Sequence, residues 1–148
     1  MIPKIFHRIW FGENKKPEEY DMWWEAWQRQ YPDCEFRTWT DNDIGELYLT
    51  SEIIKLAKGY ARKSDVARYE ILYRFGGVYL DCDFMPWHWF DFFSCDDDIV
   101  VCNEDESNDY CSIGMIAAKI KHPIFLEIID DIKNNKGKLN EIPPNIGT

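Results

Sequence analysis

Apolar residues recur along the chain with two periods, and the alternation between them predicts strands that alternate with helices. Short apolar and β-branched runs predict strands over residues 5–10, 34–39, 78–84, 99–102 and 113–118. Helical spacing predicts helices over residues 17–31, 44–49, 51–58, 60–75 and 123–134. This order is typical of an α/β fold with a largely parallel or mixed sheet, whose ligands bind at the carboxyl ends of strands.

The clearest chemical signal lies where the predicted helix 60–75 passes into the next strand. Gly76 and Gly77 are predicted to end the helix. In the strand that follows, Tyr79, Asp81 and Asp83 alternate with apolar residues, so they are expected on one face of its end.

Asp81 and Asp83 form a candidate cation site. Residues two apart on a strand have Cα atoms roughly 6.5 Å apart, so both carboxylates could reach one hard cation, or one the metal and the other a ribose. Two acids in a solvated turn are the simpler alternative. Upstream, Asp65 and Arg68 share a helix face, where they could form an ordinary surface pair. Alternatively, Asp65 could bind a base or a ribose hydroxyl while Arg68 binds phosphate oxygens.

Two aromatic segments are interpreted as packing elements. In the predicted helix 17–31, Tyr20, Trp23, Trp24, Trp27 and Tyr31 recur at helical spacing, which favours packing on the sheet over a sugar-stacking surface. Residues 87–93 (Trp-His-Trp-Phe-Asp-Phe-Phe) are expected in the core, with an exposed patch for assembly or membrane contact as the alternative.

Composition limits the class of protein. A chain of 148 residues predicts one domain, and a net charge of −10 excludes non-specific binding to nucleic acid. Five cysteines without paired spacing favour reduced thiols in a cytoplasmic protein. Neither a signal peptide nor a transmembrane segment is expected, and peripheral membrane contact is left open.

Two stretches give a more specific indication. They are I-P-K-I-F-H-R-I-W-F-G at residues 2–12 and S-D-V-A-R-Y-E-I-L-Y-R-F-G-G-V-Y-L-D-C-D at residues 64–83. Together they resemble glycosyltransferase family 32, which is similar to initiating α-mannosyltransferases, capsular polysaccharide transferases and the catalytic domain of clostridial glucosylating toxins. The long ordered motif is far more specific than a lone Asp-x-Asp.

The resemblance implies a GT-A type nucleotide-diphospho-sugar transferase fold, as one Rossmann-like α/β/α domain over residues 1–148. It implies transfer of a hexose, with retention of anomeric configuration, from a UDP-sugar or GDP-mannose to a saccharide or lipid-linked acceptor. Mn²⁺ or Mg²⁺ would be held by Asp83 directly, and Asp81 would contact the metal through water or contact the donor's ribose and sugar.

The resemblance also assigns the remaining candidates. Asp65 with Arg68 would bind the donor's sugar or diphosphate, and Trp10 would line or stack on the nucleotide base. Ser64 and Tyr79 are weaker candidates for donor binding, and His7 is more readily a structural histidine than a ligand.

The end of the chain departs from the family pattern. Members commonly continue past an Ile-x-x-Thr-Gly-Pro-like stretch, whereas this sequence stops at Ile146-Gly147-Thr148, so a short or truncated domain is expected. A nucleotide-sugar-binding module or pseudoenzyme is therefore the alternative, and a metal-dependent phosphohydrolase a weaker one. Glu104, Asp105 and Asp109 form either an acceptor loop or a solvated acidic turn.

Overall fold

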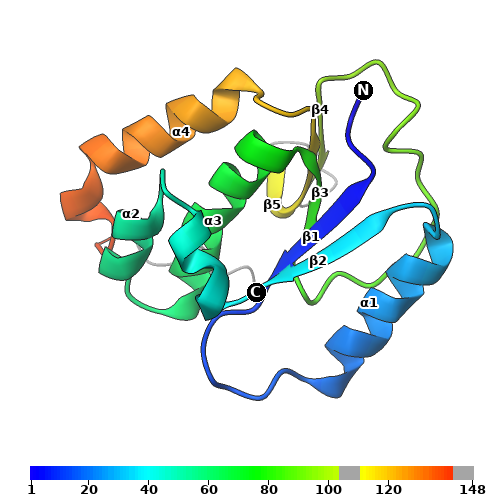
Figure 1. Cartoon of the computed structure of the whole chain (residues 1–148), viewed down its shortest axis with the longest axis horizontal. Coiled ribbons are helices and arrows are strands. Elements are labelled where there is room, and N and C mark those ends of the chain that lie inside the picture. The colour runs from blue at the N-terminus through cyan, green and yellow to red at the C-terminus, as the bar shows by residue number, and fades with distance from the viewer. Residues whose placement is uncertain (104–110, 142–148) are drawn as a thin grey trace.

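A five-stranded sheet forms the centre of the protein in a computed structural model that describes residues 1–103 and 111–141 (Figure 1). The strands are β1 (Ile5–Ile9), β2 (Glu35–Trp39), β3 (Gly77–Leu80), β4 (Ile99–Asn103) and β5 (Cys111–Ala118), in the order β2-β1-β3-β5-β4. β1 pairs in parallel with β2 and β3, whereas β5 pairs antiparallel with β3 and β4. The carboxyl ends of four strands therefore meet the amino end of β5 at one edge.

Helices cover both faces of the sheet (Figure 1). α1 (Glu18–Gln30) lies on one face, and α2 (Ser51–Leu56), α3 (Tyr60–Phe75) and α4 (Pro123–Asn134) lie on the other. Two short 3₁₀ helices, η1 (Asp41–Glu46) and η2 (Lys136–Lys138), complete the described elements. The predicted α/β architecture is confirmed. In the ranges that the structure describes, no helix combines the length and the apolar character that spanning a bilayer requires.

Each face of the sheet has its own buried core. Phe6 on β1 lies at the centre of the α1 side, where its ring contacts those of Trp27, Tyr31 and Phe36 at centroid distances of 4.8–5.9 Å. The predicted packing of the α1 aromatic face on the sheet is thus correct for Trp24 and Trp27.

Several element boundaries differ from the prediction by one residue or more, and three of them lie near the strand ends. The predicted helix 44–49 is the 3₁₀ helix η1, which begins earlier because Thr40 and Asp43 form a capping box. β5 begins two residues before the predicted Ile113. β3 ends at Leu80 rather than at Phe84, because the chain turns at Asp81.

Gly76 and Gly77 connect α3 to β3, as predicted, and both have positive φ angles, of 60° and 85°. Gly76 ends α3, with its N–H donating to Leu72 O over 2.9 Å. A Cβ at Gly77 would collide with the backbone oxygen of Ile5 on the neighbouring strand. Only glycine therefore lets β3 approach β1 and carry the residues after Leu80 to the sheet edge.

The predicted core position of residues 87–93 is wrong for its first half. Phe92 is buried, but the side chains of Trp87, Trp89 and Phe90 are 74%, 62% and 50% exposed. The ring of Phe92 packs edge-on against Phe6 at 6.0 Å and occupies the space over the sheet, which leaves the preceding rings outside.

His7 is a structural residue. It is fully buried on β1, its Nδ1 accepts a hydrogen bond from Trp39 Nε1 over 3.2 Å, and its Nε2 donates to Gly76 O over 3.0 Å. Burial lowers the pKa of His7 to about 4, because the imidazolium would lose its hydration; nearby Arg37 acts in the same direction, and the Gly76 hydrogen bond opposes it.

We expect His7 to make the fold sensitive to acid. The unfolded chain binds a proton near pH 6.5 and the folded chain near pH 4, so stability is full above pH 6.5 and decreases as the pH falls toward 4. The decrease should be about 3 kcal/mol in the free energy of unfolding. Urea unfolding of wild type and His7→Gln between pH 7 and 4 measures it, and identical pH profiles for both would contradict this origin.

Candidate active site

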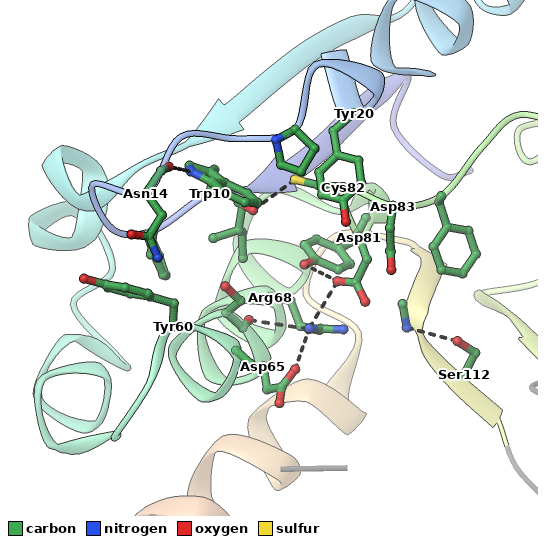
Figure 2. Close-up of a pocket in the computed structure, with 18 of the residues that line it drawn as sticks. Trp10, Asn14, Tyr20, Tyr60, Asp65, Arg68, Asp81, Cys82, Asp83 and Ser112 are labelled. Carbon is green, nitrogen blue, oxygen red and sulfur yellow. Dashed lines mark hydrogen bonds and ion pairs between the residues drawn. The ribbon is translucent and has the colours of Figure 1, made fainter. Parts of the chain in front are cut away.

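A pocket of about 800 Å³ opens at the edge where the carboxyl ends of β1 and β3 meet the amino end of β5. All seven residues predicted to bind metal or donor line this pocket, namely Trp10, Ser64, Asp65, Arg68, Tyr79, Asp81 and Asp83. They come from the end of β1, the first turns of α3, β3 and the turn that follows it (Figure 2).

Asp81 and Asp83 lie in a turn, which corrects the prediction that they share a strand face. Asp81 N–H still donates to Gly114 O of β5 over 2.8 Å, and Phe84 N–H then donates back to Asp81 O over 3.0 Å. The turn leaves Asp81 half-buried and Asp83 exposed at the pocket.

Arg68 is the most heavily bonded side chain of the pocket, and its side chain is only 3% exposed. Its Nη2 lies 2.5 Å from Asp65 Oδ1 and 3.3 Å from Asp81 Oδ1. Its Nη1 donates to Ile113 O over 2.5 Å, and its Nε donates to Ser64 O over 3.4 Å. All three guanidinium nitrogens thus bind protein groups, and Figure 2 shows the guanidinium between the two carboxylates.

Tyr79 contacts both Asp81 and Arg68 in this cluster. Its hydroxyl donates to Asp81 Oδ1 over 2.7 Å, and the Arg68 guanidinium lies over its ring at 4.6 Å. Burial raises the pKa of the Tyr79 hydroxyl well above its usual value, so it remains a donor. Burial also raises the pKa of Asp65, an effect that the Arg68 charge opposes.

The donor set suits a hard divalent cation that shares its coordination with a ligand. Within residues 1–103 and 111–141, Asp83 has no hydrogen bond or ion pair, so its carboxylate oxygens face the pocket uncommitted. Asp81 Oδ1 is engaged by Tyr79 and Arg68. No cluster of three metal-binding side chains occurs in these ranges. Carboxylates completed by phosphate oxygens and water are the usual arrangement for Mg²⁺.

Aromatic rings line the other side of the pocket. Trp10 is held by a hydrogen bond of 3.0 Å from its Nε1 to Asn14 O, and its ring meets that of Tyr20 at 6.2 Å. Burial and then the charge of Asp83 raise the pKa of the Tyr20 hydroxyl, so it remains a hydrogen-bond donor at the pocket. Tyr60 from the start of α3 also lines the pocket, and Figure 2 shows it on the same side as Trp10 and Asn14.

Sequence reasoning missed several lining residues. Helical spacing predicts sheet packing for Tyr20, and Gly114 reaches the pocket only through tertiary folding. Tyr60 precedes Ser64 by four residues on α3, so helical spacing could have identified it as a neighbour of the predicted site. Cys82 also lines it, and burial raises the pKa of this thiol to about 11, which makes it a poor nucleophile. The acceptor-loop candidates Glu104, Asp105 and Asp109 lie outside the described residues.

Comparison with known proteins matches more than half of the chain to a glycosyltransferase family. Residues 17–100 match the family described as "Glycosyltransferase sugar-binding region containing DXD motif". The chain is 38% identical to inositol phosphoceramide mannosyltransferase 1 of Schizosaccharomyces pombe and 37% identical to inositol phosphoceramide mannosyltransferase 3 of the same organism. Each alignment covers 55% of this chain. These alignments span 28% and 24% of the two relatives, so the chain matches about a quarter of their length.

A solved structure resembles almost the whole chain. The PaToxG glycosyltransferase superposes on 99% of this chain and 67% of its own, with a TM-score of 0.72 and 19% sequence identity. At that identity the likeness concerns the fold, and it confirms the predicted GT-A type architecture.

Gly114 provides a test of the packing around Asp81. A Cβ at this position would lie 2.8 Å from Asp81 Oδ2 and 2.6 Å from the Phe84 ring. Gly114→Ala should therefore lower the free energy of unfolding by about 1–3 kcal/mol through overpacking. Gly45→Ala is the matched control: no atom lies within 4 Å of its added Cβ, and stability should be unchanged or slightly higher. Equal effects in thermal unfolding would contradict the close approach.

Proposed function

We propose that this chain, which belongs to the glycosyltransferase family with a sugar-binding region containing a DXD motif, transfers a hexose from a nucleoside-diphosphate sugar to a hydroxyl acceptor. One observation carries the proposal: the free carboxylate of Asp83 and the fixed carboxylate of Asp81 lie in one pocket with an aromatic wall. The pocket thus offers a cation site for the diphosphate beside rings suited to a base.

Asp83 is the proposed direct ligand of Mn²⁺ or Mg²⁺, because its oxygens have no partner among the described residues. Asp81 contacts the metal through water or accepts from the donor's ribose or sugar hydroxyls with Oδ2. When bound, the cation supplies Lewis-acid stabilisation of the charge on the departing diphosphate.

Arg68 has a positioning role in this proposal instead of a phosphate-binding one, since all three of its nitrogens are engaged by protein groups. It holds Asp65 and Asp81 in fixed orientations at the pocket wall. Asp65 is 35% exposed and remains able to accept a hydrogen bond from a sugar hydroxyl. Ser64 and Tyr79 support the same wall.

The proposed donor is a UDP-sugar or GDP-mannose, with its base against Trp10. The mannosyltransferase relatives favour mannose, and their names point to a lipid with a polyol headgroup, inositol phosphoceramide, as a model for the acceptor. A saccharide acceptor belongs to the same proposal, in the synthesis of a surface polysaccharide or glycan. The proposed location is the cytoplasm or its membrane surface.

Transfer is proposed to retain the anomeric configuration. The acceptor hydroxyl attacks from the side of the leaving group, so its bond to the anomeric carbon forms as the bond to the diphosphate oxygen breaks. Its proton passes to the departing phosphate. This route requires no nucleophile from the enzyme.

The proposal predicts metal-dependent donor binding. We expect calorimetric titration with UDP-glucose, UDP-galactose, UDP-N-acetylglucosamine and GDP-mannose to detect one of them only when Mn²⁺ is present. Asp83→Asn should weaken that binding at least tenfold, because the neutral amide cannot balance the cation's charge. Asp130→Asn, at an exposed position on α4, is the matched control and should bind as wild type does.

Release of nucleoside diphosphate in the same samples separates two functions. Metal-dependent binding with slow release identifies a transferase, whereas binding without any release, even with acceptors added, identifies a nucleotide-sugar-binding module. Absence of binding to all four donors in the presence of metal would contradict both.

A further inference from the structure

An aromatic loop, residues 84–90, directly follows the turn that contains Asp81 and Asp83. Its sequence, Phe-Met-Pro-Trp-His-Trp-Phe, contains no Lys, Arg, Asp or Glu, in a chain of which 30% is charged. Four of its large apolar side chains are exposed: Met85 (44%), Trp87 (74%), Trp89 (62%) and Phe90 (50%). A concentration of exposed large apolar side chains of this kind marks an interaction site.

Hydrogen bonds fix both ends of the loop to α1 and to Tyr31, the C-cap residue of α1. Trp27 Nε1 donates to Phe84 O over 2.8 Å. At the other end, the Tyr31 hydroxyl donates to Phe90 O over 2.7 Å and accepts from Phe90 N over 3.0 Å. The Tyr31 ring also stacks on that of Trp89 at 6.3 Å. The exposure of these rings is therefore built into the fold.

The polar atoms of the loop suit an interface between lipid and water. Within the described residues the indole N–H groups of Trp10, Trp27 and Trp39 donate to protein groups, whereas those of Trp23, Trp24, Trp87 and Trp89 have no hydrogen-bond partner. Of these four tryptophans, only Trp87 and Trp89 are more than half exposed. Indole rings with a free N–H are enriched at membrane surfaces, where the ring meets acyl chains and the N–H meets headgroups.

The first carboxylate after the loop does not oppose such contact. Asp91 Oδ1 is turned back into the chain, where it accepts hydrogen bonds from Phe93 N over 3.1 Å and Ser94 N over 3.0 Å. Met85 is only two residues beyond Asp83, so the apolar surface begins at the rim of the pocket, which Phe84 lines.

We propose that the aromatic loop inserts Trp87, Trp89 and Phe90 into the headgroup region of a lipid bilayer. The attraction comes from ring burial alone, because the net charge of −10 repels anionic lipid. If the proposed transfer reaction holds, this contact brings the pocket to acceptors carried by the membrane. This consequence rests on the proposed function, whereas the membrane contact itself does not.

Sedimentation with phosphatidylcholine vesicles tests the contact directly, without donor or metal. The double variant Trp87→Ser/Trp89→Ser should partition onto the vesicles at least tenfold more weakly than wild type. Tyr48→Ser removes an equally exposed ring (67%) between η1 and α2 and should bind as wild type does. Replacing part of the phosphatidylcholine by phosphatidylserine should weaken wild-type binding.

Three results would overturn the membrane contact. The first is wild-type protein that does not bind the vesicles, and the second is equal binding by wild type and the tryptophan variant. The third is a wild-type dimer, seen by analytical ultracentrifugation, that is lost in the variant, because the loop would then be an interface between two copies of the chain. Nucleoside diphosphate release with a water-soluble acceptor, measured without vesicles, should be the same in wild type and variant. Failure of that assay in both proteins bears on the transfer reaction and leaves the vesicle result independent.

Discussion

The buried guanidinium of Arg68 is the interaction on which the site depends. A charge that is 3% exposed must be paired, and its partners come from three separate elements: Asp65 on α3, Asp81 after β3, and the carbonyl of Ile113 on β5. Satisfying one buried charge therefore fixes the relative positions of these elements at the sheet edge. The two aspartates of the motif also differ, because Asp81 is bound by Arg68 and Tyr79, whereas Asp83 has no hydrogen bond or ion pair among the described residues.

Glycine makes this arrangement sterically possible at two places. Gly77 lets β3 lie against β1, and Gly114 leaves room for the Asp81 carboxylate and the Phe84 ring. The fold thus brings both Asp81 and the Phe84 ring close to β5. The aromatic loop continues from this point along α1, so the cation site and the exposed rings are consecutive parts of one connection between β3 and β4.

The sequence predicted the part of the site that is local in the chain. One helix and the strand that follows it contain Asp65, Arg68 and Tyr79, with Asp81 directly after the strand. Because consecutive elements pack together, short separations along the chain are enough to bring these residues close. Tyr20 and Gly114 meet them only through tertiary contacts, which periodicity does not encode. For Trp87 and Trp89 the sequence favoured the core and left exposure as the alternative, because an apolar stretch does not reveal which of its side chains find space in the core. The end of β3 was misplaced because the alternation of side chains continued past the turn at Asp81.

Anomalous diffraction from a crystal grown with Mn²⁺ and a nucleoside diphosphate tests the central claim most directly. The account predicts one manganese peak in the pocket, at a coordination distance of about 2.2 Å from an Asp83 oxygen and from the diphosphate, with Arg68 still bound to Asp65 and Asp81. A peak bound elsewhere in the protein, or a diphosphate bound to Arg68 without metal at Asp83, would contradict it.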